Sequence, residues 1–123
     1  MKTRDFTGIR NRGPLPDPAD LEVPNDIEDL LDEYVESAET MLEELEGAAL
    51  CYEAGSDVEE SASVIRRVLH KLKGEAAMVG VQDVAELCHQ AEFAFEELPR
   101  SQGADMLLRF KDWVQAALES MAA

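Results

Sequence analysis

The stretch from Ile65 to Gly80, IRRVLHKLKGEAAMVG, decides the fold because its apolar residues recur with the period of an α-helix. At about 100° per residue, one side of this helix carries four branched apolar residues, namely Ile65, Val68, Leu72 and Val79. His70 lies on the opposite side. The stretch therefore predicts an amphipathic helix that buries one side in a core and leaves the histidine on open surface.

The helical period continues on both sides of this stretch, and no segment alternates with a period of two for long enough to indicate a strand. We predict a first helix that begins after an N-cap at Asn25 or Asp26 and ends near Gly55. A second helix is expected to begin with a capping box formed by Ser56–Glu59 and to end at Gly80. Its predicted core residues are Val58 and the four branched residues of the quoted stretch.

Two more helices complete the pattern. A third is predicted over about 82–98, and a fourth follows a loop bounded by Pro99 and Gly103. Four amphipathic helices with short connections favour an all-α, antiparallel up-down-up-down four-helix bundle. Residues 1–25 are rich in proline and glycine, so we predict a flexible tail there and a four-helix domain over 26–123.

Composition limits the possible functions. A chain of 123 residues with 46% hydrophobic residues is one domain with a real core. The net charge of -16 argues against nucleic acid as a partner, because a phosphate backbone needs basic groups. No apolar run approaches the roughly 18 residues that span a bilayer, and the N-terminus lacks a signal-peptide core. Cys51 and Cys88 are predicted to be buried thiols, which favours a reducing cytoplasm.

The surroundings of His70 indicate an anion site. On the helix wheel it is flanked by positively charged or small residues, namely Arg66, Arg67, Lys73, Gly74 and Ala77. Gly74 costs roughly 1 kcal/mol relative to alanine inside a helix, which makes sense if another molecule must come close. Lys73 is placed to meet an anion on the imidazole. On the third helix, His89 and Glu92 share a face, and Glu92 is a candidate acceptor for the Nδ1–H of His70.

The spacing His70-x-x-Lys73-Gly74 followed by Gly80 resembles the signature of histidine phosphotransfer (HPt) domains. The chain is also similar to the phosphoacceptor domain of chemotaxis-type histidine kinases, which carries a His-x-x-Glu pair like His89 and Glu92. The resemblance covers about residues 26 to 121. It implies that His70 is phosphorylated, Lys73 balances the phosphoryl charge and Gly74 gives a partner access. It further implies that Glu92 orients the imidazole, with His89 in support.

The resemblance also implies a mechanism and partners. The chain is expected to be a phosphocarrier in a two-component phosphorelay, a phosphotransfer intermediate without kinase activity of its own. Its expected partners are a histidine kinase and the receiver domain of a response regulator. No cofactor is expected in this chain, because the required Mg²⁺ belongs to the partner. Glu75, where many relatives have a small residue, is expected to cap or pair locally. The start at Met1 favours a free-standing relay protein over a fragment of a larger kinase.

Two other functions remain open. The chain is alternatively a non-catalytic helical adaptor in which His70 is not phosphorylated. The other alternative is a metal-binding bundle that uses His70, His89 and Glu92. Metal ligands in bundles usually project into the core, whereas these residues point outward, which argues against metal.

Overall fold

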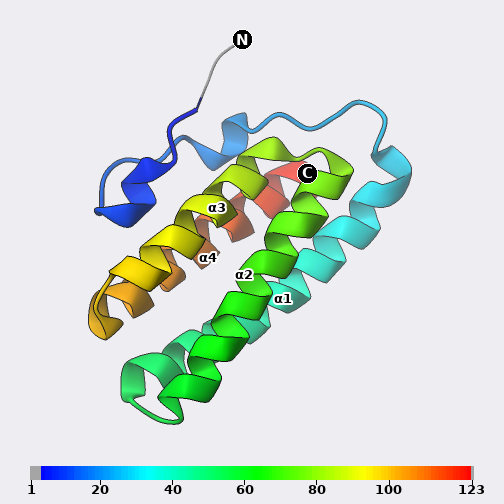
Figure 1. The fold of residues 1–123 in the computed structure, drawn as a ribbon. Helices are drawn as coiled ribbons and strands as arrows, with labels where there is room; N and C mark the ends of the chain where they lie inside the picture. Colours follow the sequence, from blue (N-terminus) through cyan, green and yellow to red (C-terminus); the bar gives the residue numbers. More distant parts are fainter. Residues whose placement is uncertain (1–3, 123) are drawn as a thin grey trace.

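The computed structural model describes residues 4–122, which form four α-helices preceded by two short 3₁₀ helices. The α-helices are α1 (Glu28–Ala54), α2 (Val58–Val79), α3 (Gln82–Glu97) and α4 (Arg100–Ala122). Consecutive helices run in opposite directions, and α1 packs against both α2 and α4 while α3 packs against the same two helices (Figure 1). The predicted all-α up-down-up-down bundle is confirmed. None of the helices in the described part of the chain is apolar enough over sufficient length to cross a membrane.

The buried side of α2 is slightly different from the predicted one. Ile65, Val68 and Leu72 are fully buried, as expected. Leu69, which the prediction omitted, is also fully buried, whereas Val58 and Val79 at the two ends are only half-buried. The core therefore packs against the middle of α2, the part that carries His70.

The ends of the helices follow local backbone chemistry. Gly55 and Gly80 end α1 and α2 with φ of 79° and 85°, the left-handed conformation that glycine adopts without strain. The predicted capping box at Ser56 is wrong. The Ser56 N–H donates to the carbonyl of Cys51 and so completes the C-terminal cap of α1. Consequently α2 begins at Val58, after Asp57, whose side chain makes no capping bond.

Three further predictions about boundaries and burial are wrong. The first helix starts at Glu28, and neither Asn25 nor Asp26 caps it, because the N-cap is Ile27. Gly103 is buried inside α4 and not at a loop boundary, because its N–H donates to Pro99 and extends the helix backward. Cys88 is buried as predicted, but Cys51 is exposed, and both thiols are free.

Residues 4–25, which we name the strap, pack against the bundle. The prediction of a flexible tail differs from the structure here; residues 1–3 of that tail lie outside the described part. The strap contains η1 (Thr7–Arg10) and η2 (Pro18–Asp20), and it runs past α3 and α4 to reach α1 (Figure 1). Phe6 and Ile9 are each only 2% exposed. The Phe6 ring packs edge-on against the Trp113 ring of α4, with ring centroids 5.2 Å apart. These apolar side chains anchor a segment whose composition otherwise resembles a loop.

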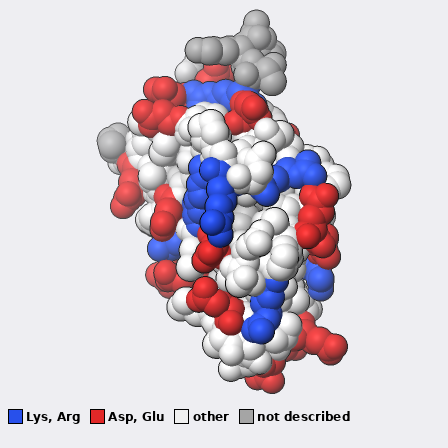
Figure 2. All heavy atoms as spheres, turned by 90° about the vertical axis from the view of Figure 1, so that its left-hand side faces the viewer, with Lys and Arg blue, Asp and Glu red and all other residues white. Residues whose placement is uncertain are grey.

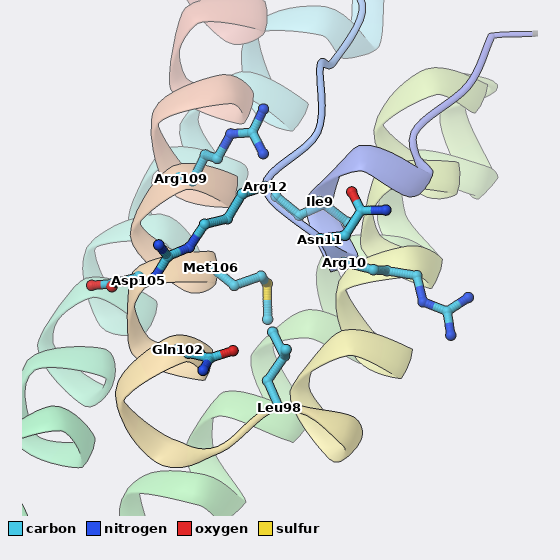
Figure 3. Close-up of a pocket in the computed structure, with 9 residues that line it drawn as sticks. All are labelled: Ile9, Arg10, Asn11, Arg12, Leu98, Gln102, Asp105, Met106 and Arg109. Atoms are coloured by element: carbon cyan, nitrogen blue, oxygen red, sulfur yellow. Dashed lines mark hydrogen bonds and ion pairs between the residues drawn. The ribbon is translucent and has the colours of Figure 1, made fainter.

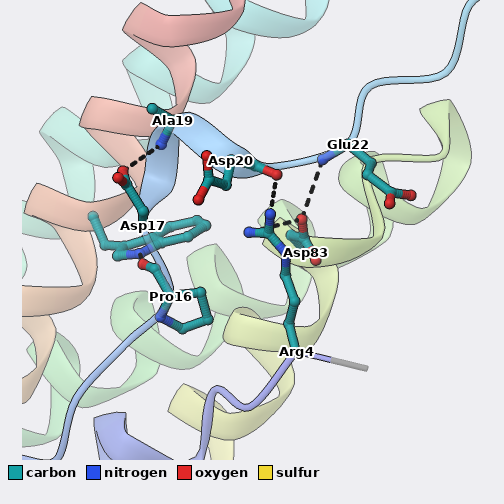
Figure 4. Close-up of polar contacts among 8 residues, drawn as sticks. Arg4, Pro16, Asp17, Ala19, Asp20, Glu22 and Asp83 are labelled. Atoms are coloured by element: carbon teal, nitrogen blue, oxygen red, sulfur yellow. Dashed lines mark hydrogen bonds and ion pairs between the residues drawn. The ribbon is translucent and has the colours of Figure 1, made fainter. Parts of the chain in front are cut away.

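Polar contacts hold the strap along its length. Arg109 of α4 donates to the carbonyls of Gly8 and Gly13, and the indole N–H of Trp113 donates to Pro16 at 2.7 Å. Further along the strap, the Asp17 carboxylate accepts from the Ala19 N–H and caps η2 (Figure 4). The backbone carbonyls of the strap thus have donors from α4, as buried polar groups require.

Replacing Phe6 with alanine tests whether the strap belongs to the folded domain. We expect Phe6→Ala to lower the free energy of unfolding by about 3 kcal/mol, because it leaves a cavity beside Trp113. Urea denaturation measures this value. The control is Leu30→Ala on α1, where the side chain is 49% exposed and the expected loss is below about 0.5 kcal/mol. Equal losses for the two variants would show that the strap does not dock.

Candidate functional site

His70 lies in the middle of α2 with its side chain 77% exposed. Its neighbours Leu69 and Leu72 are fully buried, so the helix presents the imidazole outward. The ring is thus accessible to another macromolecule while the backbone beneath it is fixed by the core.

Glu92 of α3 joins His70 to Lys73. One carboxylate oxygen, Oε2, lies 3.5 Å from Nδ1 of His70, and the other, Oε1, lies 2.5 Å from Nζ of Lys73. Lys73 and Glu92 are each less than one-third exposed, so this ion pair is partly shielded from water. A carboxylate facing Nδ1 favours the tautomer with the proton on that nitrogen, which leaves the Nε2 lone pair free. The structure therefore brings the two side chains together as the sequence predicted, while the predicted hydrogen bond from Nδ1–H to Glu92 stays a prediction.

The two arginines predicted to flank His70, Arg66 and Arg67, are already paired with glutamates. Arg66 binds both carboxylate oxygens of Glu96 on α3, at 2.6 and 3.2 Å. Arg67 binds Glu44 on α1 at 2.7 Å. The sequence predicted a ring of positive charge, but the neighbouring helices supply matching negative charge. Among the predicted cations around His70, Lys73 is thus the one that shares its carboxylate partner, Glu92, with the histidine.

Gly74 leaves open space one turn beyond His70. A Cβ built at this position meets no atom within 4 Å, so no neighbouring helix requires the glycine. The next residue, Glu75, accepts a hydrogen bond from the hydroxyl of Ser37 on α1 at 2.9 Å and is turned away from the histidine. No contact with a neighbouring helix therefore explains Gly74, and access for another molecule stays a prediction.

His89 packs against a neighbour on its own helix. Its ring lies edge-on to Phe93, one turn later on α3, with ring centroids 5.0 Å apart. The supporting role predicted for His89 stays a prediction. In the described part of the chain, no group of three or more histidine, cysteine or acidic side chains is arranged to hold a metal ion.

The sequence analysis missed one exposed residue near the site and did not place the buried Cys88 beside it. Met78 is 85% exposed two turns after His70, and a helix wheel drawn for exposed apolar residues would have found it. Cys88 is buried next to Glu92 and Lys73; burial and the Glu92 charge raise the pKa of its thiol far above the ordinary value. Cys88 therefore stays protonated and acts as a packing residue.

Comparisons with known proteins assign the four-helix bundle to a family. The model of the Hpt domain matches residues 29–123. The chain belongs to the Hpt domain family. Histidine phosphotransfer within phosphorelay signalling is accordingly its role. No solved structure gives a significant match.

Two curated relatives are chemotaxis proteins. The chain is 27% identical to the chemotaxis protein CheA of Halobacterium salinarum over 103 residues, which are 79% of this chain and 15% of that protein. It is 32% identical to CheA of Treponema pallidum over 101 residues, 77% of this chain and 12% of that protein. This Hpt domain thus spans only a small part of the relatives that it matches.

Proposed function

We propose that His70 is the phosphorylated residue of this Hpt domain, and that the chain carries a phosphoryl group between the aspartate of a receiver domain and a second signalling protein. The observation that supports this role is the exposed imidazole whose Nδ1 faces Glu92. An exposed imidazole is suited to nucleophilic attack on phosphorus when Nδ1 faces a carboxylate and the Nε2 lone pair is free.

Transfer to His70 forms one bond to phosphorus and breaks another. The Nε2 lone pair of His70 forms a bond to the phosphorus of an aspartyl phosphate, and the bond between phosphorus and the carboxylate oxygen breaks. The aspartate leaves as a carboxylate with the electron pair of that bond. The imidazole becomes a cation that still carries its Nδ1 proton, and the Glu92 carboxylate stabilises this positive charge. The reverse step returns the phosphoryl group to a receiver aspartate and regenerates neutral His70.

Lys73 stabilises the phosphoryl oxygens in this proposal. Its ammonium lies on the same helix face as His70 and forms an ion pair with Glu92 before phosphorylation. A phosphoryl group on Nε2 carries negative charge that Lys73 can neutralise by donating a charge-assisted hydrogen bond. Such loose transition states need mainly positioning and charge stabilisation. Gly74 leaves room for the partner, and His89 is assigned a supporting place on the adjacent surface of α3.

The proposed partners are a histidine kinase and the receiver domain of a response regulator. The Mg²⁺ that phosphoryl transfer needs is assigned to the partner, because the described residues do not gather a suitable set of oxygen ligands. A cytoplasmic location is part of the proposal, and the two free thiols agree with a reducing compartment. The chain would return unchanged after each relay and have no kinase activity of its own. A helical adaptor without phosphorylation is the alternative that the first experiment excludes or supports.

His70→Gln tests the acceptor directly. Phosphoramidate, a small phosphodonor, is expected to load the wild-type chain with one acid-labile, base-stable phosphoryl group, and His70→Gln is expected to abolish the loading. Intact-mass spectrometry measures the product. The matched control is His89→Gln, which should load like the wild type. Loading of His70→Gln would assign the phosphate to His89, and no loading of any form would favour the adaptor.

Glu92→Gln tests the orienting role of the carboxylate. We expect the fraction of His70 with its proton on Nδ1 to fall, and the loading rate to fall by about tenfold, because the amide does not stabilise the imidazolium. Imidazole ¹⁵N chemical shifts report the tautomer, and phosphoramidate loading reports the rate. Glu96→Gln is the control on the same helix, since Glu96 pairs with Arg66. Equal effects of both variants would remove the specific role of Glu92.

Gly74→Ala tests access, with Gly47→Ala as its matched control, since a Cβ at Gly47 of α1 also meets no atom within 4 Å. Both substitutions should raise the free energy of unfolding by up to about 1 kcal/mol, because alanine favours a helix interior. Only Gly74→Ala should slow transfer to a purified receiver domain with Mg²⁺, by about tenfold. Unchanged transfer, measured by the decay of phosphohistidine, would contradict the assignment of Gly74.

A further inference from the structure

We propose that the strap is a positioning element of the phosphotransfer site: it holds α3 so that Glu92 meets His70 and Lys73. This inference rests on the proposed function of His70. The strap lies before residue 29, where the match to the family model begins. Its contacts are concentrated on α3 and α4, which is why it can influence a residue of α3 without touching the histidine.

The strap binds α3 at both ends. Asp83, in the first turn of α3, faces the Arg4 guanidinium at 3.5 Å and accepts from the backbone N–H of Glu22 at 3.3 Å (Figure 4). Arg4 also donates to the carbonyl of Asp20, which ties the two parts of the strap together over this end of the helix. At the last residue of α3, Glu97 accepts a hydrogen bond from Arg10 at 2.6 Å.

The strap also contacts the middle of α3. The guanidinium of Arg10 lies over the ring of Phe93, 5.7 Å from its centroid, and His89 packs on the same ring. Glu92 is the residue immediately before Phe93, between the two ends that the strap binds. The strap therefore fixes α3 on both sides of the carboxylate that faces His70.

On its other side the strap is anchored to α4. The bonds from Arg109 and Trp113 to strap carbonyls, together with the buried Phe6 ring, fix the strap to a helix that lies away from the site. Figure 2 shows this face of the molecule, where basic and acidic side chains stand next to each other around an uncharged strip. The strap is thus a bridge between α4, which is long and deeply packed, and α3, which is the shortest α-helix among the described residues.

A hollow of about 640 Å³ between the strap and the start of α4 offers an alternative function, a small-molecule site. Ile9, Leu98 and Met106 form its apolar part, and Arg10 points away from it (Figure 3). Its two other arginines are engaged, since Arg12 faces Asp105 and Arg109 binds strap carbonyls. No cation is left to attract a charged ligand, so these groups serve to join the strap to the helices.

The position of α3 decides whether Glu92 contacts His70. The contact between Glu92 and Nδ1 of His70 is 3.5 Å long, so a shift of α3 by about 1 Å decides between contact and separation. Displacements of this size in a positioning group are enough to change the rate of a reaction by an order of magnitude or more. Loosening α3 should therefore lower the fraction of His70 that carries its proton on Nδ1, and should slow phosphorylation.

The double variant Arg4→Ala/Arg10→Ala removes the two arginine contacts of the strap with the ends of α3, and leaves the backbone bond from Glu22 to Asp83 in place. Its matched control is Arg12→Ala, an arginine of the same segment that faces Asp105 of α4 at 3.5 Å. Both variants lose exposed or partly exposed charges and should fold. Glu97→Gln, which weakens one contact from the α3 side, is the second variant. The readouts are the His70 tautomer, from imidazole ¹⁵N shifts, and the rate of loading by phosphoramidate at several donor concentrations.

We expect the double variant to lower the Nδ1–H fraction and the maximal loading rate, the latter by about three- to tenfold, without changing the half-saturating phosphoramidate concentration. Glu97→Gln should give a smaller change in the same direction, and Arg12→Ala none. A double variant that behaves like Arg12→Ala, or that changes only the melting temperature, would overturn the inference. If wild-type His70 is not loaded at all, the proposed function fails, and the tautomer measurement still tests the strap.

Discussion

Leu69 and Leu72 are completely buried on either side of His70, and their packing fixes the direction in which the imidazole points. Burying each leucine stabilises the fold by roughly 2 kcal/mol, so rotating α2 to turn the histidine inward would expose both at a large cost. The exposure of His70 is therefore imposed by the core and needs no special local conformation. The position of Glu92 opposite the ring then depends on how α3 packs against this fixed helix.

Arg66, Arg67 and Lys73 near the histidine are each paired with a glutamate from a neighbouring helix. The side chains of Lys73 and Glu92 are each more than one-quarter exposed, so the lysine can exchange its partner at a modest cost. A phosphoryl group with two negative charges would compete with Glu92 for Lys73, while Glu92 would remain beside the imidazolium that phosphorylation creates. In the proposed relay, the same two side chains, Lys73 and Glu92, can thereby satisfy the neutral and the phosphorylated histidine, in a chain whose net charge of -16 would otherwise disfavour an added anion.

Much of the bundle could be predicted because its signals are local. The apolar period of α2, the glycines at its ends and the exposure of His70 all follow from a few neighbouring residues. One failure arises where a residue has two possible roles, since Ser56 was predicted to open α2 but closes α1. The strap was missed because its prolines and glycines indicate a loop, whereas burial of Phe6 depends on distant Trp113.

The strap also changes what must be regarded as the folding unit of this Hpt domain. The family model begins at residue 29, yet two donors on α4 find their acceptors only before that point among the described residues: the Trp113 indole binds Pro16, and Arg109 binds two strap carbonyls. A chain cut at the family boundary would lose these hydrogen bonds, at roughly 0.5–1.5 kcal/mol for each, and would expose the apolar surface under Phe6. The sequence of α4 is therefore adapted to the strap, and the strap in turn reaches α3 and the glutamate beside His70.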